Sequence, residues 1–185
     1  IHWMDQVLGW TEEKFPRKIF SVAGRHIKED STDAPDTQVV LYEFESFTAT
    51  WEHRQYAANE AEKTNIGCYF YGTEGTFHMG WLDGWTFYPS NKNKPIIHED
   101  PKLDKPDDQN IAGLWADFMH SIANKWRPVC DIEIGHRSTN MSLLGMLSWK
   151  LGRSVAWDGE KIIGDDEANA LLQRKYRGEW VYPTV

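Results

Sequence analysis

His2 and Asp5 stand three residues apart in the opening run IHWMDQVL, whose apolar residues share one face of a helix. Side chains at i and i+3 project from the same helical face, so the Asp5 carboxylate can orient the His2 imidazole and raise its basicity. Such a pair suits a general base that removes a hydroxyl proton while a hydride leaves the same carbon. Because helical His-x-x-Asp pairs are also common as structural pairs, the spacing alone leaves both interpretations open.

Other chemistry-bearing patterns are weaker. Asp131, Glu133 and His136 are typical of a helix start, where carboxylates cap the backbone and favour the helix dipole. The run His98-Glu99-Asp100 falls in a polar segment, which we interpret as a solvated loop. The sequence contains no GxGxxG, GxxxxGK[ST], GxSxG or HExxH motif, so it offers no familiar dinucleotide, triphosphate, nucleophile or metal site.

Composition narrows the class of protein. The 185 residues fit one domain, and 41% hydrophobic content is enough for a core. A net charge of −8 disfavours nucleic acid as a partner. The sequence also lacks any uninterrupted stretch of about 18 apolar residues, which a membrane-spanning helix would need. The sequence holds two cysteines and 10 tryptophans. The aromatic residues suit either a core or a sugar-stacking surface, and the candidates for the latter are Trp51, Tyr56, Tyr69, Tyr71, Trp81 and Trp85.

The elements that must position these residues change type along the chain. Alternating residues and short turns predict β-structure over 18–88, with strands near 39–44, 47–53, 68–71, 76–81 and 85–88. The proline-rich, polar segment 89–109 is expected to be a loop.

Helical periodicity follows, with an amphipathic helix over 111–122 that Asp108 would cap. A second helix is predicted over 133–151, ended by Gly152, with Gly145 allowing a close backbone approach. A third would start at Asp165 or Asp166 and bury Ala168, Leu171, Leu172 and Tyr176.

Strands first and helices afterwards predict an α+β fold, an open, mainly antiparallel sheet with helices packed on one face. Three helices cover one side of such a sheet, so the other side is expected to meet another domain or subunit. The opening run has no N-cap before it, and we expect the chain to be a fragment of a longer protein.

Several collinear motifs add a more specific signal. They are 1–5 (IHWMD), 24–25 (GR), 36–38 (DTQ), 71–76 (YGTEGT), 134–138 (IGHRS), 151–153 (LGR), 157–158 (WD), 164–169 (GDDEAN), 171–172 (LL) and 176–177 (YR). In this order they resemble the C-terminal part of bacterial Gfo/Idh/MocA-family oxidoreductases, over essentially the whole chain.

The resemblance implies a single substrate-binding and oligomerisation domain over 1–185, with the N-terminal Rossmann domain of the family missing from this chain. His2 matches the family's proton-transferring histidine, and Asp5 matches a position that in some members touches substrate hydroxyls. The family's dinucleotide glycines and its catalytic lysine are not in this sequence. The tail residues His136, Arg137, Asp165, Asp166 and Arg177 are expected to maintain the fold.

We therefore expect the substrate-side domain of an NAD(P)-dependent oxidoreductase acting on a sugar, polyol or related hydroxy compound. His2 would be catalytic, Asp5, Arg54 and Tyr56 would contact substrate, and the missing domain would bind NAD or NADP. The fragment alone should be inactive, and a homo-oligomer should form through the open sheet face. No metal, nucleic-acid or membrane partner is expected. The cytoplasm is favoured, and the periplasm stays open because an export signal would precede Ile1.

Two alternatives remain at this point. Some members of the same family cleave glycosides by transient oxidation with tightly held NAD, and the same proton-transfer residues would serve them. The chain could also be a non-catalytic carbohydrate-binding or assembly module, which the tryptophan content allows.

Overall fold

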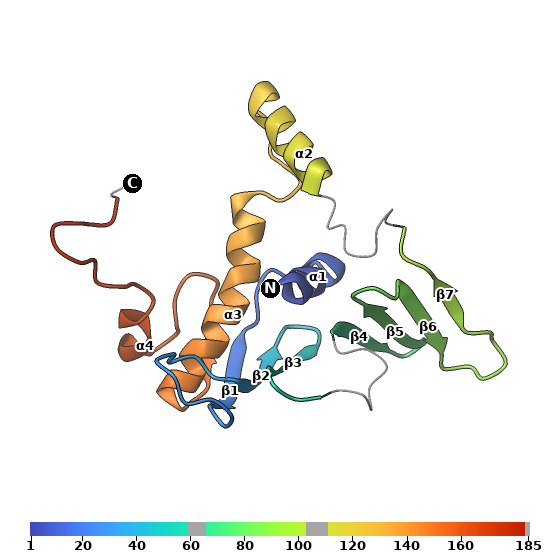
Figure 1. The fold of residues 1–185 in the computed structure, drawn as a ribbon, viewed down its shortest axis with the longest axis horizontal. Helices are drawn as coiled ribbons and strands as arrows, with labels where there is room; N and C mark the ends of the chain where they lie inside the picture. Colours follow the sequence, from blue (N-terminus) through green and yellow to red (C-terminus); the bar gives the residue numbers. More distant parts are fainter. Residues whose placement is uncertain (59–65, 103–110, 184–185) are drawn as a thin grey trace. The chain divides into compact units, whose positions relative to one another are not determined.

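The computed structural model, which describes residues 1–58, 66–102 and 111–183, contains two four-stranded antiparallel sheets (Figure 1). One sheet belongs to a first unit, Ile1–Tyr56 with Glu133–Val185, and the other to a second unit, Ala57–Ile132. The antiparallel α+β fold expected from the sequence is confirmed, although the strands are divided between two sheets. The assignment of 1–185 as one domain stays a prediction.

The sheet of the first unit has the strand order β3-β2-β1-β8. The strands are β1 (Lys18–Gly24), β2 (Thr37–Glu43), β3 (Thr48–Arg54) and the two-residue β8 (Val155–Ala156). Alternation along β2 buries Gln38, Val40 and Tyr42 and leaves Val39 and Leu41 exposed, so the two faces of the sheet differ sharply. The sequence did not predict β8, which is too short to carry a period.

Two helices cover the buried face, α1 (His2–Thr11) and the long α3 (Ile132–Leu151), close to the predicted ranges. The core of this unit consists of buried residues from both helices, the sheet and the segment after β8: Met4, Leu8, Ile19, Val40, Tyr42, Phe44, Met141, Leu144, Leu147, Val155, Trp157, Ile162 and Ala168.

Close contact between α3 and β2 is confirmed at Gly145. A β-carbon there would lie 3.1 Å from Val40 Cγ2 and 3.3 Å from the Tyr42 hydroxyl. Further along α3, the Ser148 hydroxyl accepts the Ser21 backbone N–H at 3.0 Å and donates to the Arg153 carbonyl at 2.7 Å.

The C-terminal segment is less helical than the sequence suggested. Gly152 ends α3 with a φ of 66°, as predicted, but α4 spans only Asp166–Ala170. Ala168 is buried, whereas Leu171, Leu172 and Tyr176 are exposed, so their predicted burial is wrong. The helix ends before it can turn these side chains toward the core.

The second unit contains β4 (Gly67–Gly72), β5 (Gly75–Gly80), β6 (Trp85–Pro89), β7 (Ile97–Glu99) and α2 (Ile111–Asn124). The sheet follows the order β4-β5-β6-β7, and the turns at 72–75 and 83–84 connect strands as expected. β7 lies in the segment predicted as a loop, and this prediction is wrong there because Ile97–Glu99 pair with β6. Helix α2 is confirmed, and its apolar residues, Leu114, Trp115, Phe118 and Ile122 among them, are exposed. The predicted cap Asp108 lies outside the described residues.

No helix in the described part of the chain is long and apolar enough to cross a membrane.

Candidate functional site

Helix α1 is fixed to α3 by a hydrogen bond between two side chains far apart in sequence. The buried Ser138 hydroxyl donates to Asp5 Oδ1 at 2.5 Å. One turn along α3, the Ser142 hydroxyl contacts Met4 Sδ at 3.1 Å. The first turn of α1 is therefore held in place on α3, and Asp5 is the polar anchor.

His2 lies on the exposed side of this anchored turn. It precedes Asp5 by three residues, so the geometry that the sequence predicted, a histidine and a carboxylate one turn apart, is present in α1. Ser138 occupies one oxygen of the Asp5 carboxylate, and the group carries a second acceptor oxygen. A solvent-facing imidazole on a fixed helical turn can accept a proton from a hydroxyl brought to it.

Arg54 and Tyr56 lie together at the end of β3 and just beyond it. Arg54 Nε is 3.3 Å from Glu52 Oε1, and the Lys28 ammonium lies 5.2 Å from the centre of the Tyr56 ring. Both residues are exposed.

The two predicted pairs occupy opposite ends of the first sheet. Near the middle of helix α3, the Met141 carbonyl accepts a hydrogen bond from the Tyr42 hydroxyl. Near the C-terminus of the same helix, Lys150 Nζ lies 3.7 Å from Asp33 Oδ2. Asp33 belongs to the β1–β2 connection, at the same sheet end as Arg54, whereas Asp5 binds the N-terminal half of α3. The seven residues of β3 extend over about 20 Å. The structure thus places His2 and Asp5 one turn apart in α1, Arg54 and Tyr56 at the end of β3, and the two pairs at opposite ends of the first sheet.

Sequence reasoning did not select Ser138 as a site residue. The available signal was its place on the predicted helix, because it lies three residues before the inward-facing Met141, where a polar side chain needs a partner.

The predicted fold-maintaining role is confirmed for Asp165. It caps α4 by accepting the Ala168 N–H at 3.0 Å, and the Arg153 guanidinium contacts both of its oxygens at 2.9–3.0 Å. The Ala168 N–H, and then Arg153, lower the pKa of Asp165. Asp166 and Arg177 are exposed.

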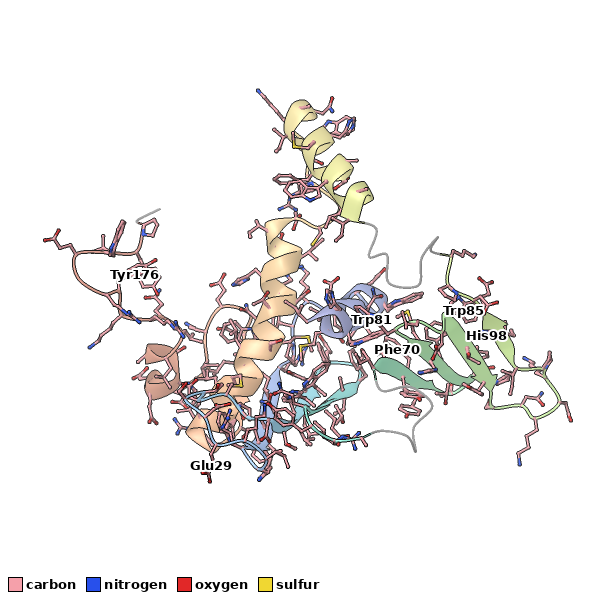
Figure 2. All side chains as sticks on the ribbon, in the orientation of Figure 1. Glu29, Phe70, Trp81, Trp85, His98 and Tyr176 are labelled. Atoms are coloured by element: carbon pink, nitrogen blue, oxygen red, sulfur yellow. The ribbon has the colours of Figure 1, made fainter. Side chains whose placement is uncertain are left out.

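The candidate aromatic residues are divided between the two units. Trp51 packs against the core of the first unit, and Tyr56 is exposed on that unit. Trp85 belongs to the second unit, beside the labelled His98 on the same sheet (Figure 2). Its ring stacks on that of Phe77, with the ring centroids 5.5 Å apart.

In the second unit, the histidine and the cysteine that could carry chemistry both lie on strands of the sheet, His98 on β7 and Cys68 on β4. His98 lies between Thr86 Oγ1, at 2.8 Å, and Asp100 Oδ1, at 3.3 Å, so it is a strand residue and not a loop residue. Burial raises the pKa of the Cys68 thiol to about 11, which disfavours the nucleophilic thiolate. Within the described residues, no three metal-ligating side chains lie close enough to hold an ion.

Comparison with known proteins gives one family match. The pattern described as "Oxidoreductase family, C-terminal alpha/beta domain", of the Gfo/Idh/MocA type, matches residues 87–182. No curated protein matches the chain.

Solved structures share the fold at low sequence identity. An oxidoreductase from Agrobacterium radiobacter, in complex with NAD+, L-tartaric acid and magnesium, is 11% identical with a TM-score of 0.63, over 84% of this chain and 46% of that one. The aldose-aldose oxidoreductase of Caulobacter crescentus, complexed with glycerol, is 16% identical with a TM-score of 0.60, over 84% and 45%. The UDP-N-acetylglucosamine 3-dehydrogenase of Acidithiobacillus ferrooxidans is 19% identical with a TM-score of 0.59, over 81% and 47%. The chain thus spans about half the length of these structures.

Proposed function

This chain belongs to the Gfo/Idh/MocA oxidoreductase family, as its C-terminal alpha/beta domain, and we propose that it forms the substrate side of an NAD(P)-dependent enzyme acting on a sugar, polyol or related hydroxy compound. The observation that carries the proposal is the anchored first turn of α1, where the Asp5–Ser138 hydrogen bond fixes the backbone that bears the exposed His2. The sugar-acting enzymes of Caulobacter crescentus and Acidithiobacillus ferrooxidans, which share this fold, support the substrate class.

The residues of this chain do not fit a dinucleotide site. The strands of the described residues pair antiparallel, and the sequence has no GxGxxG, whereas dinucleotides bind at the glycine turn of a parallel β-α-β unit. In the proposal, NAD or NADP is therefore bound by another domain of the complete enzyme. We expect the 185-residue chain alone to show no turnover.

The role of this chain is to handle the proton. His2 accepts the proton of the substrate hydroxyl, and Asp5 sets the position of the helical turn and offers its second oxygen to a neighbouring hydroxyl. Arg54 and Tyr56 stay predicted substrate contacts, but they lie at the opposite end of the sheet, so one small sugar or polyol held at His2 would not touch them as well.

The open face of the first sheet is proposed as the surface of a homo-oligomer. Phe20 and Val22 of β1 and Val39 and Leu41 of β2 all project from this face and are exposed. Contiguous apolar side chains of this kind are typical of an interaction surface.

Activity of the complete enzyme tests the proposal. With a panel of sugars and polyols, His2→Ala should lower kcat by about 10²–10⁴-fold, as measured by NAD(P)H absorbance. His120→Ala, which removes an exposed histidine on α2, is the matched control and should retain activity. Unchanged turnover in His2→Ala would refute the assignment. Release of an aglycone from a glycoside without net NAD(P)H change would assign redox-neutral glycoside cleavage instead.

A further inference from the structure

A cavity of about 480 Å³ lies beside α3 within the first unit. Its polar lining comes from two places, the N-terminal half of α3 and the turn after Trp157. The polar residues are Glu133, His136, Arg137, Asn140, Asp158 and Glu160. A volume in this range matches that of sites for small organic ligands.

The cavity is separate from the His2 turn. Its α3 residues Glu133, Arg137 and Asn140 follow one another at intervals of four and three, so they form one stripe of the helix. The residues that hold α1, Ser138 and Ser142, form a different stripe about 150° further round the helix. Helix α3 therefore presents one polar stripe to α1 and another to the cavity.

Two side-chain pairs of the cavity lie one turn apart within α3. Arg137 forms an ion pair with Glu133, one turn back, and Asn140 Nδ2 lies 3.2 Å from His136 Nε2. This differs from Arg153, whose guanidinium joins α3's end to α4 through Asp165. His136 and Arg137 thus support α3 itself rather than connecting it to another element, and their fold-maintaining role stays a prediction.

The opposite wall is fixed by its own backbone. Asp158 Oδ1 accepts the N–H groups of Glu160 and Lys161, both at 2.9 Å, and these bonds lower the pKa of Asp158. Gly159 has a φ of 107°, and a β-carbon there would lie 2.8 Å from the Phe15 ring. The turn is thus held tightly against Phe15, and the cavity wall is preorganised.

The chemistry of the lining combines an apolar floor with mixed polar groups. Met141, Leu144 and Trp157 are buried below it. Three carboxylates, on Glu133, Asp158 and Glu160, face one guanidinium, so the lining is negatively charged overall. Carboxylates accept hydrogen bonds from hydroxyls, and the Arg137 and Asn140 side chains donate them, while phosphate or carboxylate ligands would be repelled.

We propose that this cavity is a second ligand site, for an uncharged saccharide or polyol, distinct from the His2 site. Alternating hydroxyl donors and acceptors on such a ligand match the carboxylates, Arg137 and Asn140, and its C–H surface matches the apolar floor. This site does not depend on the proposed function, because it uses neither His2 nor a cofactor.

Titration of the full chain tests the site by two-dimensional amide NMR. The probes are D-glucose, D-galactose, N-acetyl-D-glucosamine and glycerol, with D-glucose 6-phosphate as the charged counterpart. At least one neutral probe should give saturable shifts at the amides of Arg137, Asn140 and 158–160. The phosphate ester of glucose should bind at least about tenfold more weakly than glucose does.

Paired variants decide the assignment. Asn140→Ala should weaken binding about tenfold, since it removes a donor while keeping a good helix former. Asn124→Ala on α2 is the matched control, because Asn124 also pairs with a histidine one turn back, His120, outside the cavity. Far-UV circular dichroism of both variants verifies the fold. The proposal is overturned if none of the neutral probes gives saturable shifts there, or if Asn140→Ala binds as tightly as the wild type. Retained shifts in His2→Ala would support a site separate from the catalytic one.

Discussion

The Tyr42 hydroxyl donates a hydrogen bond to the Met141 carbonyl at 2.9 Å and thereby lies 3.3 Å from the position that a β-carbon on Gly145 would take. The Met141 carbonyl is also the natural acceptor for the Gly145 N–H in an α-helix, four residues on. Tyr42 thus contributes both a hydrogen bond to α3 and, together with Val40, the close packing at Gly145. The packing of Tyr42 against Met141 and Gly145 keeps α3 close to β2.

Gly145→Ala should destabilise the chain by about 1 kcal/mol, although alanine favours helices by about that amount. Val40 and Tyr42 are both buried and held by the strand ladder, so neither can move away from the added methyl group. The free energy of unfolding in urea measures the effect. Gly135→Ala in the same helix is the control, because nothing lies within 4 Å of the β-carbon position of Gly135. This variant should have a higher free energy of unfolding than the wild type. Equal effects at both glycines would contradict the packing argument.

Ser138→Ala should loosen α1 from α3, at a cost of about 1–3 kcal/mol, because the Asp5 carboxylate loses its donor. Amide hydrogen exchange should show faster exchange in His2–Thr11 and little change in β1–β3. Thr139→Ala is the neighbouring control, since the Thr139 hydroxyl bonds to the Gly135 carbonyl of its own helix. If α1 exchanged at the wild-type rate in Ser138→Ala, the anchor would lie elsewhere.

The contribution of Asp165 to stability should depend on pH. Its pKa is lowered in the folded state by the Ala168 N–H and by Arg153, so its contribution is present above the unfolded pKa of about 3.9. That contribution is lost as the pH falls through the lower, folded pKa. The stability difference between wild type and Asp165→Asn should therefore be largest near neutral pH and shrink under acid, in thermal melts over a pH series. The adjacent, exposed Asp166→Asn controls for loss of charge, and a difference that persists unchanged in acid would argue against the cap.

Leu41→Glu should dissociate an oligomer formed through the open sheet face without unfolding the subunit. Leu41 is 45% exposed in the single chain and lies opposite Phe20, so a charge there costs little alone and much at an interface. Light scattering at several concentrations gives the mass of wild type and variant. Leu143→Glu, at an exposed leucine of α3, is the control. A wild-type chain that stays monomeric at every concentration would remove the proposed interface.

Sequence periodicity was sufficient to predict a helix or strand where a segment has a long, regular pattern of apolar residues. The helices over 2–11 and 132–151 and the alternating strand over 47–53 are of this kind. The pattern failed where tertiary pairing decides. Ile97–Glu99 carry no alternation of their own and become a strand because β6 offers them an edge, whereas Leu171 and Leu172 follow a helix too short to bury them.

The candidate site was only partly accessible from sequence. Spacing within one helix connects His2 to Asp5, because three residues make nearly one turn. No local pattern could connect Asp5 to Ser138, which is 133 residues away, or place Arg54 at the other end of the sheet. The cavity at Arg137 combines a helix stripe with a turn more than 20 residues later, so it emerges only from the fold.

The bond from the Ser21 N–H to Ser148 also protects an edge. β8 pairs with β1 only at Lys18 and Ile19, and further along β1 the described part of the chain supplies no partner strand on that side. An open row of N–H groups there would be a template on which another chain could add a strand. The Ser148 hydroxyl accepts the Ser21 N–H and donates a hydrogen bond to the Arg153 carbonyl, so a helix side chain takes the place of a partner strand at Ser21. One buried serine thereby removes the first N–H beyond β8 from the edge that an added strand could use.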